Sequence, residues 1–283
     1  MTKINNTLTD FGFTQKSFVI MGVLNITPDS FSDGGEYTKL DCAMNMAKKM
    51  IQDGASIIDI GGESTRPGAE EVSAEEEKKR VLPVIKEIRK FSDVAISIDT
   101  TKAVVAEEAL LSGANIINDI SGTTFDPEMI DLIRRFKPPT IIMHTSARPK
   151  EMQSNTNYEN IIQDITDFLK TQFEKLVEAG LSPSDIIIDP GIGFGKTYEQ
   201  NIEILKKLSC FKSITNNILL GVSRKSLFKT MLEADVKDRL AGTIATNLFA
   251  FQQGIKYFRV HDVLENVHAL KTINLLATKK ETT

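Results

Sequence analysis

The feature that most constrains the fold of this chain is a short apolar segment that recurs eight times along it. The segments are residues 17–24, 56–60, 94–98, 115–117, 140–143, 185–188, 217–220 and 256–260. Each is close to continuously apolar and rich in β-branched residues, which is typical of strands buried on both faces of a sheet. The pattern therefore predicts a sheet that is covered on both sides.

Helical patterns lie between these segments. A capping-box pattern at Ser73–Glu76 predicts the start of a helix over residues 74–90. Amphipathic stretches at residues 158–179 and 238–253 each stop directly before a glycine, as helices commonly do. Strand alternating with helix indicates parallel strands joined by right-handed crossovers.

The number of segments distinguishes the common α/β architectures. Eight segments spaced by about 33 residues correspond to eight βα units, which is the count of an α/β fold of the (β/α)8 TIM barrel type. A doubly wound sheet would usually have a Gly-rich turn after its first strand, whereas residues 25–35 have loop composition. No Pro/Ser-rich linker divides the chain, so we expect one barrel domain over residues 14–276, with loose terminal extensions at residues 1–13 and 277–283.

The charge balance argues against some classes of partner. The chain has 34 Lys and Arg residues against 38 Asp and Glu residues, a formal net charge of −4, and no Lys/Arg-rich block, so we expect no nucleic acid and no membrane as a partner. No apolar run approaches the roughly 18 residues that cross a bilayer, and the polar N-terminus lacks the apolar core of a signal peptide. Cys42 and Cys210 are too few for a disulfide framework. We therefore expect a cytoplasmic globular enzyme or binding protein.

Polar side chains follow nearly all of the segments, where the strands of a barrel would end. They include Asn25, Asp59, Asp99, Asn118, Asp119, His144, Asp189, Arg224, Lys225, Ser226, Arg259, His261 and Asp262. In this fold the loops after the strands carry the chemistry, and phosphate groups bind after the seventh and eighth strands, where the cations of this chain gather. One Asp can accept two adjacent N–H groups from a flat ring. The pattern predicts a ligand with a phosphate-like end and a flat end rich in N–H donors.

Two of these features also have ordinary structural interpretations. Asp262 is equally well explained as the N-cap of a helix. Residues 189–197 resemble a nucleotide-binding P-loop but have Pro190 where its first glycine would stand. We expect the glycines there to let the backbone approach the ligand closely.

Five motifs follow one another in a specific order. They are Met21–Gly35, Asp59–Gly68, Asp189–Gly195, Gly221–Ser226 and Arg259–Asp262. With them the chain resembles the dihydropteroate synthases, a pterin-binding barrel family, over about residues 17–275. The resemblance implies condensation of 6-hydroxymethyl-7,8-dihydropterin pyrophosphate with 4-aminobenzoate to 7,8-dihydropteroate and pyrophosphate, in folate biosynthesis. The family is the target of sulfonamides, which mimic 4-aminobenzoate.

The resemblance also implies roles for individual residues. The pterin ring would be held by Asp99, Asn118, Asp189 and Lys225, with Ile120 and Met143 packed on it. The pyrophosphate would be bound by Arg259 and His261, and Mg²⁺ by Asn25. The 4-aminobenzoate would be bound by Thr65, Arg66, Pro67, Phe194 and Ser226, and Gly221 and Val260 complete the substrate-binding set. Catalysis would depend on Asp99, Lys225, Arg259 and His261.

The expected chemistry depends on the leaving group, because the amine of 4-aminobenzoate is a weak nucleophile. Mg²⁺, Arg259 and His261 would stabilise the charge that develops on the departing pyrophosphate. Mg²⁺ takes few protein ligands beside phosphate oxygens, which suits a single amide such as Asn25. We therefore expect a dissociative path through a pterin-methyl cation, without a covalent enzyme intermediate.

Two alternatives remain open at this point. A methyltetrahydrofolate-binding methyltransferase domain would share the barrel and the pterin site, but it would not need the cations of residues 223–226 and 259–261. A catalytically silent pterin-binding paralogue would be expected to have lost the two loops at residues 25–35 and 64–68, which look complete.

The chain departs from the common pattern of the family in one loop. The family often has Met-Gln-Gly after the histidine of the fifth strand, whereas this chain has Thr-Ser-Ala-Arg at residues 145–148. No function is carried over to these four residues. The family is usually dimeric, which implies a homodimer, and we expect a single-function chain without a fused pathway partner.

Overall fold

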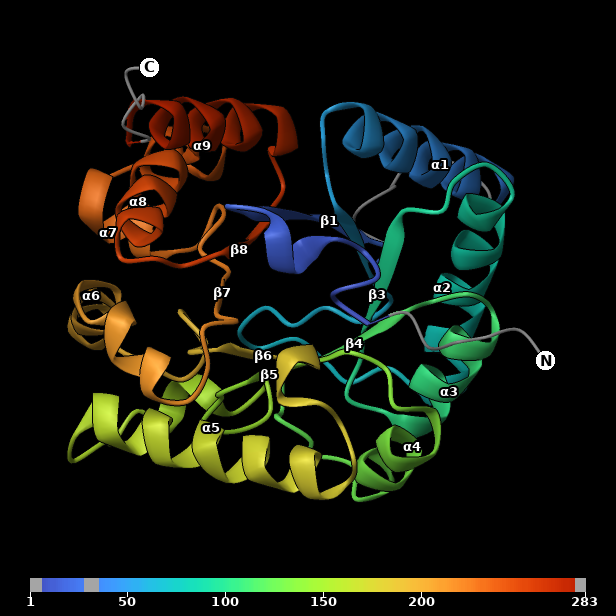
Figure 1. Ribbon diagram of the computed structural model, residues 1–283, viewed down its shortest axis with the longest axis horizontal. Coiled ribbons are helices and arrows are strands. Elements are labelled where there is room, and N and C mark those ends of the chain that lie inside the picture. Colours follow the sequence, from blue (N-terminus) through green and yellow to red (C-terminus); the bar gives the residue numbers. More distant parts are fainter. Residues whose placement is uncertain (1–6, 28–35, 278–283) are drawn as a thin grey trace, which may run out of the picture.

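The computed structural model describes residues 7–27 and 36–277 (Figure 1). Its strands are β1 (Val19–Asn25), β2 (Ile57–Gly61), β3 (Ala95–Asp99), β4 (Ile116–Asp119), β5 (Thr140–Met143), β6 (Ile186–Asp189), β7 (Leu219–Leu220) and β8 (Tyr257–Val260). All pairings are parallel, in the order β6-β5-β4-β3-β2-β1-β8-β7. A parallel bridge between Ile188 and Ile218 joins the two ends of the sheet. The predicted (β/α)8 barrel is therefore confirmed.

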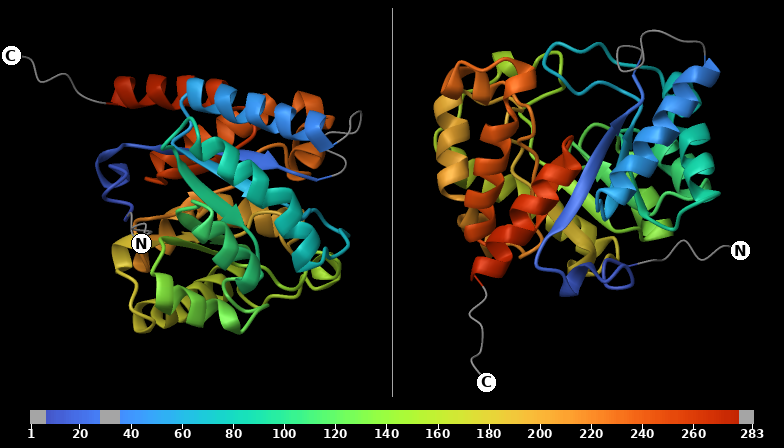
Figure 2. Two further views of the ribbon diagram at one scale, coloured as in Figure 1. Left: turned by 90° about the vertical axis from the view of Figure 1, so that its right-hand side faces the viewer. Right: turned by 90° about the horizontal axis from the view of Figure 1, so that it is seen from above.

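Helices surround the barrel on its outside (Figures 1 and 2). They are α1 (Glu36–Gln52), α2 (Ala74–Arg89), α3 (Ala103–Leu111), α4 (Glu128–Phe136), α5 (Ile161–Glu178), α6 (Tyr198–Lys206), α7 (Leu227–Leu232), α8 (Leu240–Gln252) and α9 (Val263–Ala277). The predicted N-cap of α2 is confirmed, because the hydroxyl of Ser73 accepts the backbone N–H of Glu76 at 3.3 Å. Helices α5 and α8 begin two or three residues later than the amphipathic pattern predicts, and Asn160 is the N-cap of α5.

Two apolar layers explain why the strands are continuously apolar. One strand residue in two points outward and packs against the helices, as Ile58, Ile96 and Ile142 do. The intervening residues point into the barrel and form its floor, with two residues from β1 and one from each other strand: Val19, Met21, Ile57, Ala95, Ile116, Ile141, Ile187, Leu219 and Tyr257. This alternation has a period of two residues. The residues above the floor that point inward are therefore fixed by the register of the strands.

The N-terminal segment is not the loose extension that the sequence suggests, as far as residues 7–13 are concerned. Leu8 and Phe13 are almost fully buried, and both pack against the floor of the barrel. The backbone N–H of Leu8 also donates to the carboxylate of Asp185 at 2.8 Å. A polar and partly aromatic sequence gives no periodic signal, so the prediction missed that this segment closes the lower end of the barrel. Residues 1–6 and 278–283 lie outside the described residues.

Candidate functional site

The side chains above the apolar floor are mostly polar and converge at the carboxyl ends of the strands. Two residues beyond the floor, the inward positions are Asp59, Ser97, Asn118, Met143, Asp189, Gly221 and Arg259, and two further on lie Asp99 and His261. Active sites of this fold lie at this end of the barrel. The ring of polar strand ends that the sequence predicts is therefore a consequence of the strand register.

Arg259 on β8 links two carboxylates from neighbouring strands. Its Nε donates to Asp59 Oδ2 at 2.7 Å, and its Nη2 donates to Asp99 Oδ2 at 2.6 Å. Asp59 is fully buried and also accepts the hydroxyl of Ser97 at 2.6 Å and the side-chain amide of Asn118 at 3.3 Å. Because each of these groups restrains the next, the three strands and Arg259 form one preorganised polar network.

Asp99 is the most perturbed acid in this network. Burial raises its pKa to about 7; Arg259 opposes the rise, whereas nearby Asp59 adds to it. For Arg259, burial disfavours the charged guanidinium, but Asp59 and Asp99 outweigh that effect and its pKa is raised. Among the described residues, Asp99 Oδ1 is buried without a hydrogen-bond partner. A buried acceptor without a donor costs free energy, so this oxygen is suited to a donor on a ligand.

Asp189 and Lys225 form the opposite side of the ring. Asp189 Oδ1 accepts the backbone N–H of Gly191 at 2.7 Å. Burial raises the pKa of Asp189, and Lys225 opposes the rise. Lys225 Nζ lies 4.5 Å from the centroid of the Phe194 ring and donates to the carbonyl of Ile192, and burial lowers the pKa of Lys225 to about 8. The ring thus holds a cation that is readily deprotonated beside a carboxylate and an aromatic face.

A small apolar cluster covers one side of the polar ring. It consists of Ile120, Met143, Phe194 and Met152, with Ala147 packed against it. The first three residues are those that the family resemblance implies for contacts with the substrates, and the structure brings them together. Met152 and Ala147 lie in the loop after β5 and were not expected there. The cluster offers an apolar surface next to the polar side chains, which suits the face of a planar ring.

His261 lies directly beyond Arg259. Its backbone N–H and its ring Nδ1 lie 3.1 and 3.0 Å from the hydroxyl of Ser223. Burial, together with the charges of Arg259 and Arg224, lowers its pKa to about 4. The imidazole is therefore neutral at pH 7 in the free protein. A bound anion would counteract the two arginines and favour the imidazolium.

The cations that follow β7 do not all face the ring. Arg224 Nε donates to Asp262 Oδ2 at 3.0 Å in a partly exposed ion pair. This pair accounts for the carboxylate of Asp262, for which an N-cap role was the alternative. Ser226 is exposed at the start of α7. Of residues 224–226, Lys225 is the one whose side chain turns toward the ring: it is half-buried, and its Nζ donates to the carbonyl of Ile192.

His144 points away from the ring and has a structural role. Its ring packs edge-on against Phe168, with centroids 5.1 Å apart, and its Nδ1 lies 3.0 Å from the buried Lys196 Nζ. Burial lowers the pKa of His144 to about 2, and Lys196 contributes. Lys196 also donates to the carbonyls of Gly191 and Phe194, each at 2.9 Å. The loop after β6 is therefore held by a buried lysine.

The glycine at position 191 is required by packing. Its φ is 72°, and a Cβ there would lie 1.9 Å from the carbonyl oxygen of His144. The sequence interpretation assigned the glycines of this loop to the approach of a ligand. At Gly191 the closest neighbour is the backbone of the protein itself, because the loop crosses directly over the end of β5.

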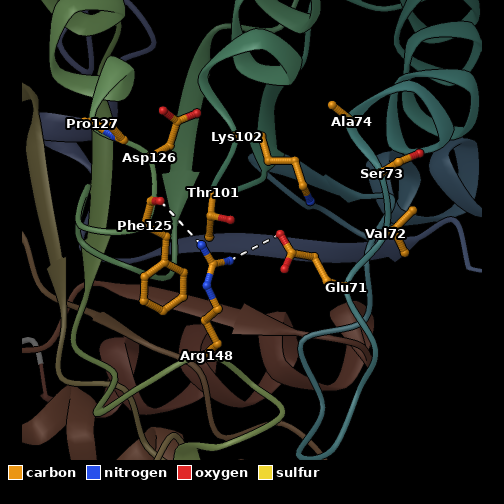
Figure 3. Close-up of a pocket in the computed structure, with 10 residues that line it drawn as sticks. All are labelled: Glu71, Val72, Ser73, Ala74, Thr101, Lys102, Phe125, Asp126, Pro127 and Arg148. Carbon is orange, nitrogen blue, oxygen red and sulfur yellow. Dashed lines mark hydrogen bonds and ion pairs between the residues drawn. The ribbon is translucent and has the colours of Figure 1, made fainter.

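Two loops border the ring at β2 and β5, and we call residues 62–73 the β2 loop and residues 144–160 the β5 loop. A cavity of about 410 Å³ lies between them, next to the starts of α2, α3 and α4 (Figure 3). A smaller cavity reaches inward to Asp99 and Thr65. Arg148, Phe125 and Thr101 line both cavities. Arg148 therefore stands between the outer cavity and the polar ring.

The β2 loop is attached to the barrel at its start. Lys102 Nζ donates to Glu77 on α2 at 2.8 Å and to Glu63 in the loop. Burial disfavours the charge of Lys102, but Glu63 and Glu77 outweigh it and its pKa is raised. Beyond this anchor Arg66 and Pro67 are exposed, while Thr65 is half-buried. The three predicted substrate-binding residues thus lie on the outer part of the loop.

Asn25 is at the end of β1 and is half-buried. Its Oδ1 and the side chain of Asp99 flank the same position above Gly61, where a Cβ would lie 3.6 Å from Asn25 Oδ1 and 3.5 Å from Asp99 Cβ. Within residues 7–27 and 36–277, no cluster of three or more His, Cys, Asp or Glu side chains could hold a metal ion. A metal ion there would be coordinated mainly by oxygen atoms of a bound substrate and of water, which fits the coordination of Mg²⁺.

The structure differs from the predicted set at two positions. Val260 packs in the outer layer against the helices, because residues 259 and 261 point inward and the alternation turns 260 outward. Only its backbone could reach a ligand. Asp59 is the opposite case: it was noted as a strand end but was not among the predicted site residues, yet it is the buried partner of Arg259. A carboxylate within an apolar strand was the signal that could have found it.

Comparisons with known proteins agree on one family. The model of the pterin binding enzyme family matches residues 21–261. The dihydropteroate synthase of Clostridium beijerinckii is 45% identical over 271 residues, which cover 95% of this chain and 98% of the relative. That of Bacillus subtilis is 46% identical over 261 residues, covering 92% and 89%.

Solved structures give the same result. A crystal structure of a dihydropteroate synthase from Clostridium difficile in the presence of pteroic acid has a TM-score of 0.87 and 46% identity, covering 93% of this chain and 97% of the other. One from Xanthomonas albilineans with 4-aminobenzoic acid has a TM-score of 0.86 and 34% identity, covering 92% and 94%.

None of the helices in the described part of the chain is both long and apolar enough to cross a membrane.

Proposed function

We propose how the residues of the ring divide the work of catalysis, from the premise that this chain belongs to the pterin-binding enzyme family and, within it, to the dihydropteroate synthases. The reaction joins a dihydropterin, activated as its pyrophosphate, to the amine of 4-aminobenzoate. A structure from the same family contains 7,8-dihydropteroate, and another contains 4-aminobenzoic acid. The ring must therefore hold a flat N–H-rich heterocycle and an anion.

The pterin is held by the hydrogen-bond acceptors among the polar side chains at the strand ends. The observation that carries this proposal is the pair of buried carboxylates, Asp99 at the end of β3 and Asp189 at the end of β6, with β4 and β5 between them in the sheet. Asp99 Oδ1 lacks a donor within the described residues, and the N–H groups of a pterin supply one. Asn118 adds an amide, and Ile120 and Met143 pack against the face of the ring. Lys225 donates toward the heterocycle from the side of Asp189.

The pyrophosphate is held by Arg259 and His261. The ion pairs to Asp59 and Asp99 use two of the five N–H donors of the guanidinium, and the others can serve an anion. The neutral His261 gains a proton when the anion binds, because negative charge offsets Arg259 and Arg224. Both groups stabilise the charge that develops as the C–O bond breaks. No nucleophilic side chain is needed in this dissociative path.

Mg²⁺ is the cofactor that this arrangement suits. Asn25 would hold it with its amide oxygen, and the substrate phosphates would supply further oxygen ligands. When bound, Mg²⁺ would neutralise charge on the leaving pyrophosphate. The side-chain oxygens of Asn25 and Asp99, which both lie within 4 Å of a Cβ placed at Gly61, support a hard cation at this place.

The aminobenzoate lies between Phe194 and the outer part of the β2 loop. Lys225, whose Nζ lies over the Phe194 ring, is at the boundary of this site and the pterin site. Thr65, Arg66 and Pro67 come from the loop, and Ser226 from the start of α7. This places the amine next to the exocyclic carbon of the pterin once pyrophosphate leaves. Gly221 lies between Asp189 and Arg259 and keeps this junction open.

Release of pyrophosphate is the experiment that tests this function. The purified chain is mixed with dihydropterin pyrophosphate, 4-aminobenzoate and Mg²⁺, and pyrophosphate is measured with a coupled assay. Release that depends on all three components supports the assignment. Binding of the pterin without release, at any metal concentration, would leave a catalytically silent pterin-binding protein. Chelation that stops the release, with recovery on adding Mg²⁺, tests the metal separately.

We propose in addition that the protein is a cytoplasmic homodimer with one barrel domain over residues 14–276. Large apolar side chains are exposed on neighbouring helices, namely Phe249 on α8 and Leu275 and Leu276 on α9. Because α8 and α9 pack against each other, these side chains lie on adjoining helices of the outer surface, where a partner subunit would cover them. Light scattering after size-exclusion chromatography gives the mass in solution, and a monomer at micromolar concentration would contradict the proposal.

A further inference from the structure

The β2 loop and the β5 loop are joined by polar contacts on their outer parts. The contacts are the N–H of Gly68 to the carbonyl of Pro149 at 3.0 Å, Arg148 Nη1 to Glu71 Oε1 at 3.3 Å, and Lys150 Nζ to Glu70 Oε1 at 2.9 Å. Two neighbouring acids on one loop thus face two bases on the other. The pairs lie within a few residues of Thr65, Arg66 and Pro67, which the proposed function assigns to the aminobenzoate.

Arg148 is fixed on its other side by Phe125, which lies in the loop after β4. Its guanidinium lies 4.6 Å from the centroid of the Phe125 ring, and Nη2 lies 3.5 Å from the Phe125 carbonyl oxygen. Figure 3 shows the side chain between Phe125 and Glu71, with the guanidinium pointing into the cavity. Because the contacts with Phe125 restrain the orientation of the guanidinium, Arg148 is already in position to pair with Glu71.

The β5 loop that carries both bases is itself attached to the wall of the pterin site. Ala147 and Met152 pack in the apolar cluster with Ile120 and Phe194. The hydroxyl of Ser146 donates to the carbonyl of Met152 at 3.2 Å, which ties the loop to itself. A segment that contacts the β5 loop is therefore held at a defined position relative to the proposed pterin site.

We propose that Arg148 and Lys150 are positioning residues that hold the β2 loop over the aminobenzoate site. The proposal rests on the proposed function, and it assigns a role to a segment in which this chain departs from the common pattern of the family. Single exposed ion pairs contribute little. Here two pairs and a backbone hydrogen bond act on one loop, so together they lower the fraction of molecules in which the loop is open. The affinity for aminobenzoate rises with the closed fraction.

The test combines steady-state kinetics with hydrogen exchange. The double variant Arg148→Gln, Lys150→Gln removes both charges and leaves the catalytic ring intact. A conservative variant, Arg148→Lys with Lys150→Arg, keeps both charges. Arg135→Gln is a matched control, because Arg135 forms a similar exposed pair with Glu107 on the outside of the barrel. Exchange of the backbone amides of residues 64–73 is measured in the free protein, so this readout needs no turnover.

Loss of the two pairs is expected to raise the KM for 4-aminobenzoate by about three- to tenfold, as two weak pairs acting together would. The KM for dihydropterin pyrophosphate and kcat stay within about twofold. Exchange over residues 64–73 becomes faster, and Arg135→Gln changes neither value. The conservative variant restores most of both values, because it keeps the two charges but loses the stacking of the Arg148 guanidinium on Phe125. High ionic strength raises the KM for 4-aminobenzoate in both proteins, because it screens Arg66 from the carboxylate of this substrate. The rise is steeper in the unaltered protein, in which salt also screens the two ion pairs.

Three results would overturn the proposal: unchanged exchange over residues 64–73, an unchanged KM for 4-aminobenzoate, or an equal rise in the KM values of both substrates. The last result would mean that Arg148 and Lys150 stabilise the whole site rather than the position of the β2 loop. If the unaltered protein fails to release pyrophosphate, the proposed function fails instead, and the exchange experiment still decides whether the two bases hold the β2 loop.

Discussion

Replacing Asp59 by Asn is the most informative perturbation of the ring. Asp59 is fully buried, it is 2.7 Å from Arg259 Nε, and it also binds Ser97 and Asn118. Asn has the same shape and keeps one acceptor oxygen for Arg259, while its NH2 group replaces the oxygen that accepts the hydroxyl of Ser97. That hydroxyl can turn to accept instead, so the main change is the loss of the negative charge. Arg259 keeps Asp99 as its second partner.

The expected loss of stability follows from this partial compensation. Leaving a buried charge without any partner costs about 3–5 kcal/mol, whereas losing one charge-assisted hydrogen bond costs about 1.5–3 kcal/mol. Because Asp99 remains, about 2–3 kcal/mol is expected. An unfolding entropy of about 2.1 cal/mol/K per residue gives about 0.6 kcal/mol/K for 283 residues. The Tm is therefore expected to fall by about 3–5 °C.

The same change alters how Asp99 titrates. Asp59 is one of the groups that raise the pKa of Asp99 to about 7, so the variant lowers it. A carboxyl whose pKa is raised by folding favours the folded state at low pH, and that advantage is lost as pH rises from the unfolded pKa of about 4 to the folded one. The contribution of Asp99 to the stability of the unaltered protein is therefore lost between about pH 4 and 7, and this contribution is smaller in the variant, whose Asp99 has a lower pKa.

Ligand binding supplies the assay. Ionised Asp99 accepts the pterin N–H groups, so the affinity for a pterin is expected to rise as pH increases through about 7. In Asp59→Asn the midpoint of this rise moves to lower pH. Isothermal titration calorimetry over a pH series measures it, with thermal unfolding on the same samples. Asp131→Asn, a change at an exposed ion pair, is the control. An unchanged midpoint together with an unchanged Tm would refute the view that Asp59 and Asp99 are coupled through Arg259.

Three further predictions concern neighbouring groups. Asp189→Asn should weaken pterin binding by about 2–3 kcal/mol, because a buried charged acceptor is lost, and equal affinity by calorimetry would place the pterin elsewhere. Gly191→Ala should lower the urea midpoint of unfolding well beyond Gly12→Ala, since both have positive φ but only the first places a Cβ against a carbonyl; equal losses would show that the φ alone matters. His261→Asn should weaken pyrophosphate binding more at pH 6 than at pH 8, while sparing a pterin without phosphates, because the anion favours the imidazolium; a loss independent of pH would contradict this.

The fold could be predicted because its signal is periodic. Continuous apolar strands require cover on both faces, and their number and spacing match one architecture. The position of the site follows as well, because a two-residue period from Ile57 to Asp59 and from Ile187 to Asp189 leads directly from the floor to the polar ring. Here register is enough to place the side chains.

What the sequence did not reveal depends on contacts between distant segments. Asp59 can be recognised as essential only when Arg259 is known to be its partner, 200 residues away. His144 and Gly191 look like ligand-binding residues in the sequence, and their packing against Lys196 and against each other becomes visible only in space. The same holds for Arg148, because its partners Phe125 and Glu71 come from two other loops.

The buried N-terminal segment has a consequence for the order in which the protein is made. The N–H of Leu8 is bonded to Asp185, 177 residues later, and β1 pairs with β8 through Val19 and Tyr257. During synthesis, the N–H of Leu8 therefore has no final acceptor until 177 further residues have followed. Contacts of such long sequence separation form late and slowly. Until the floor of the barrel is complete, Leu8 and Phe13 are apolar groups without full cover. A chaperone that shields this segment of the nascent chain should therefore raise the yield of folded barrel. Changing both residues to polar ones should remove that dependence but weaken the packing against the floor.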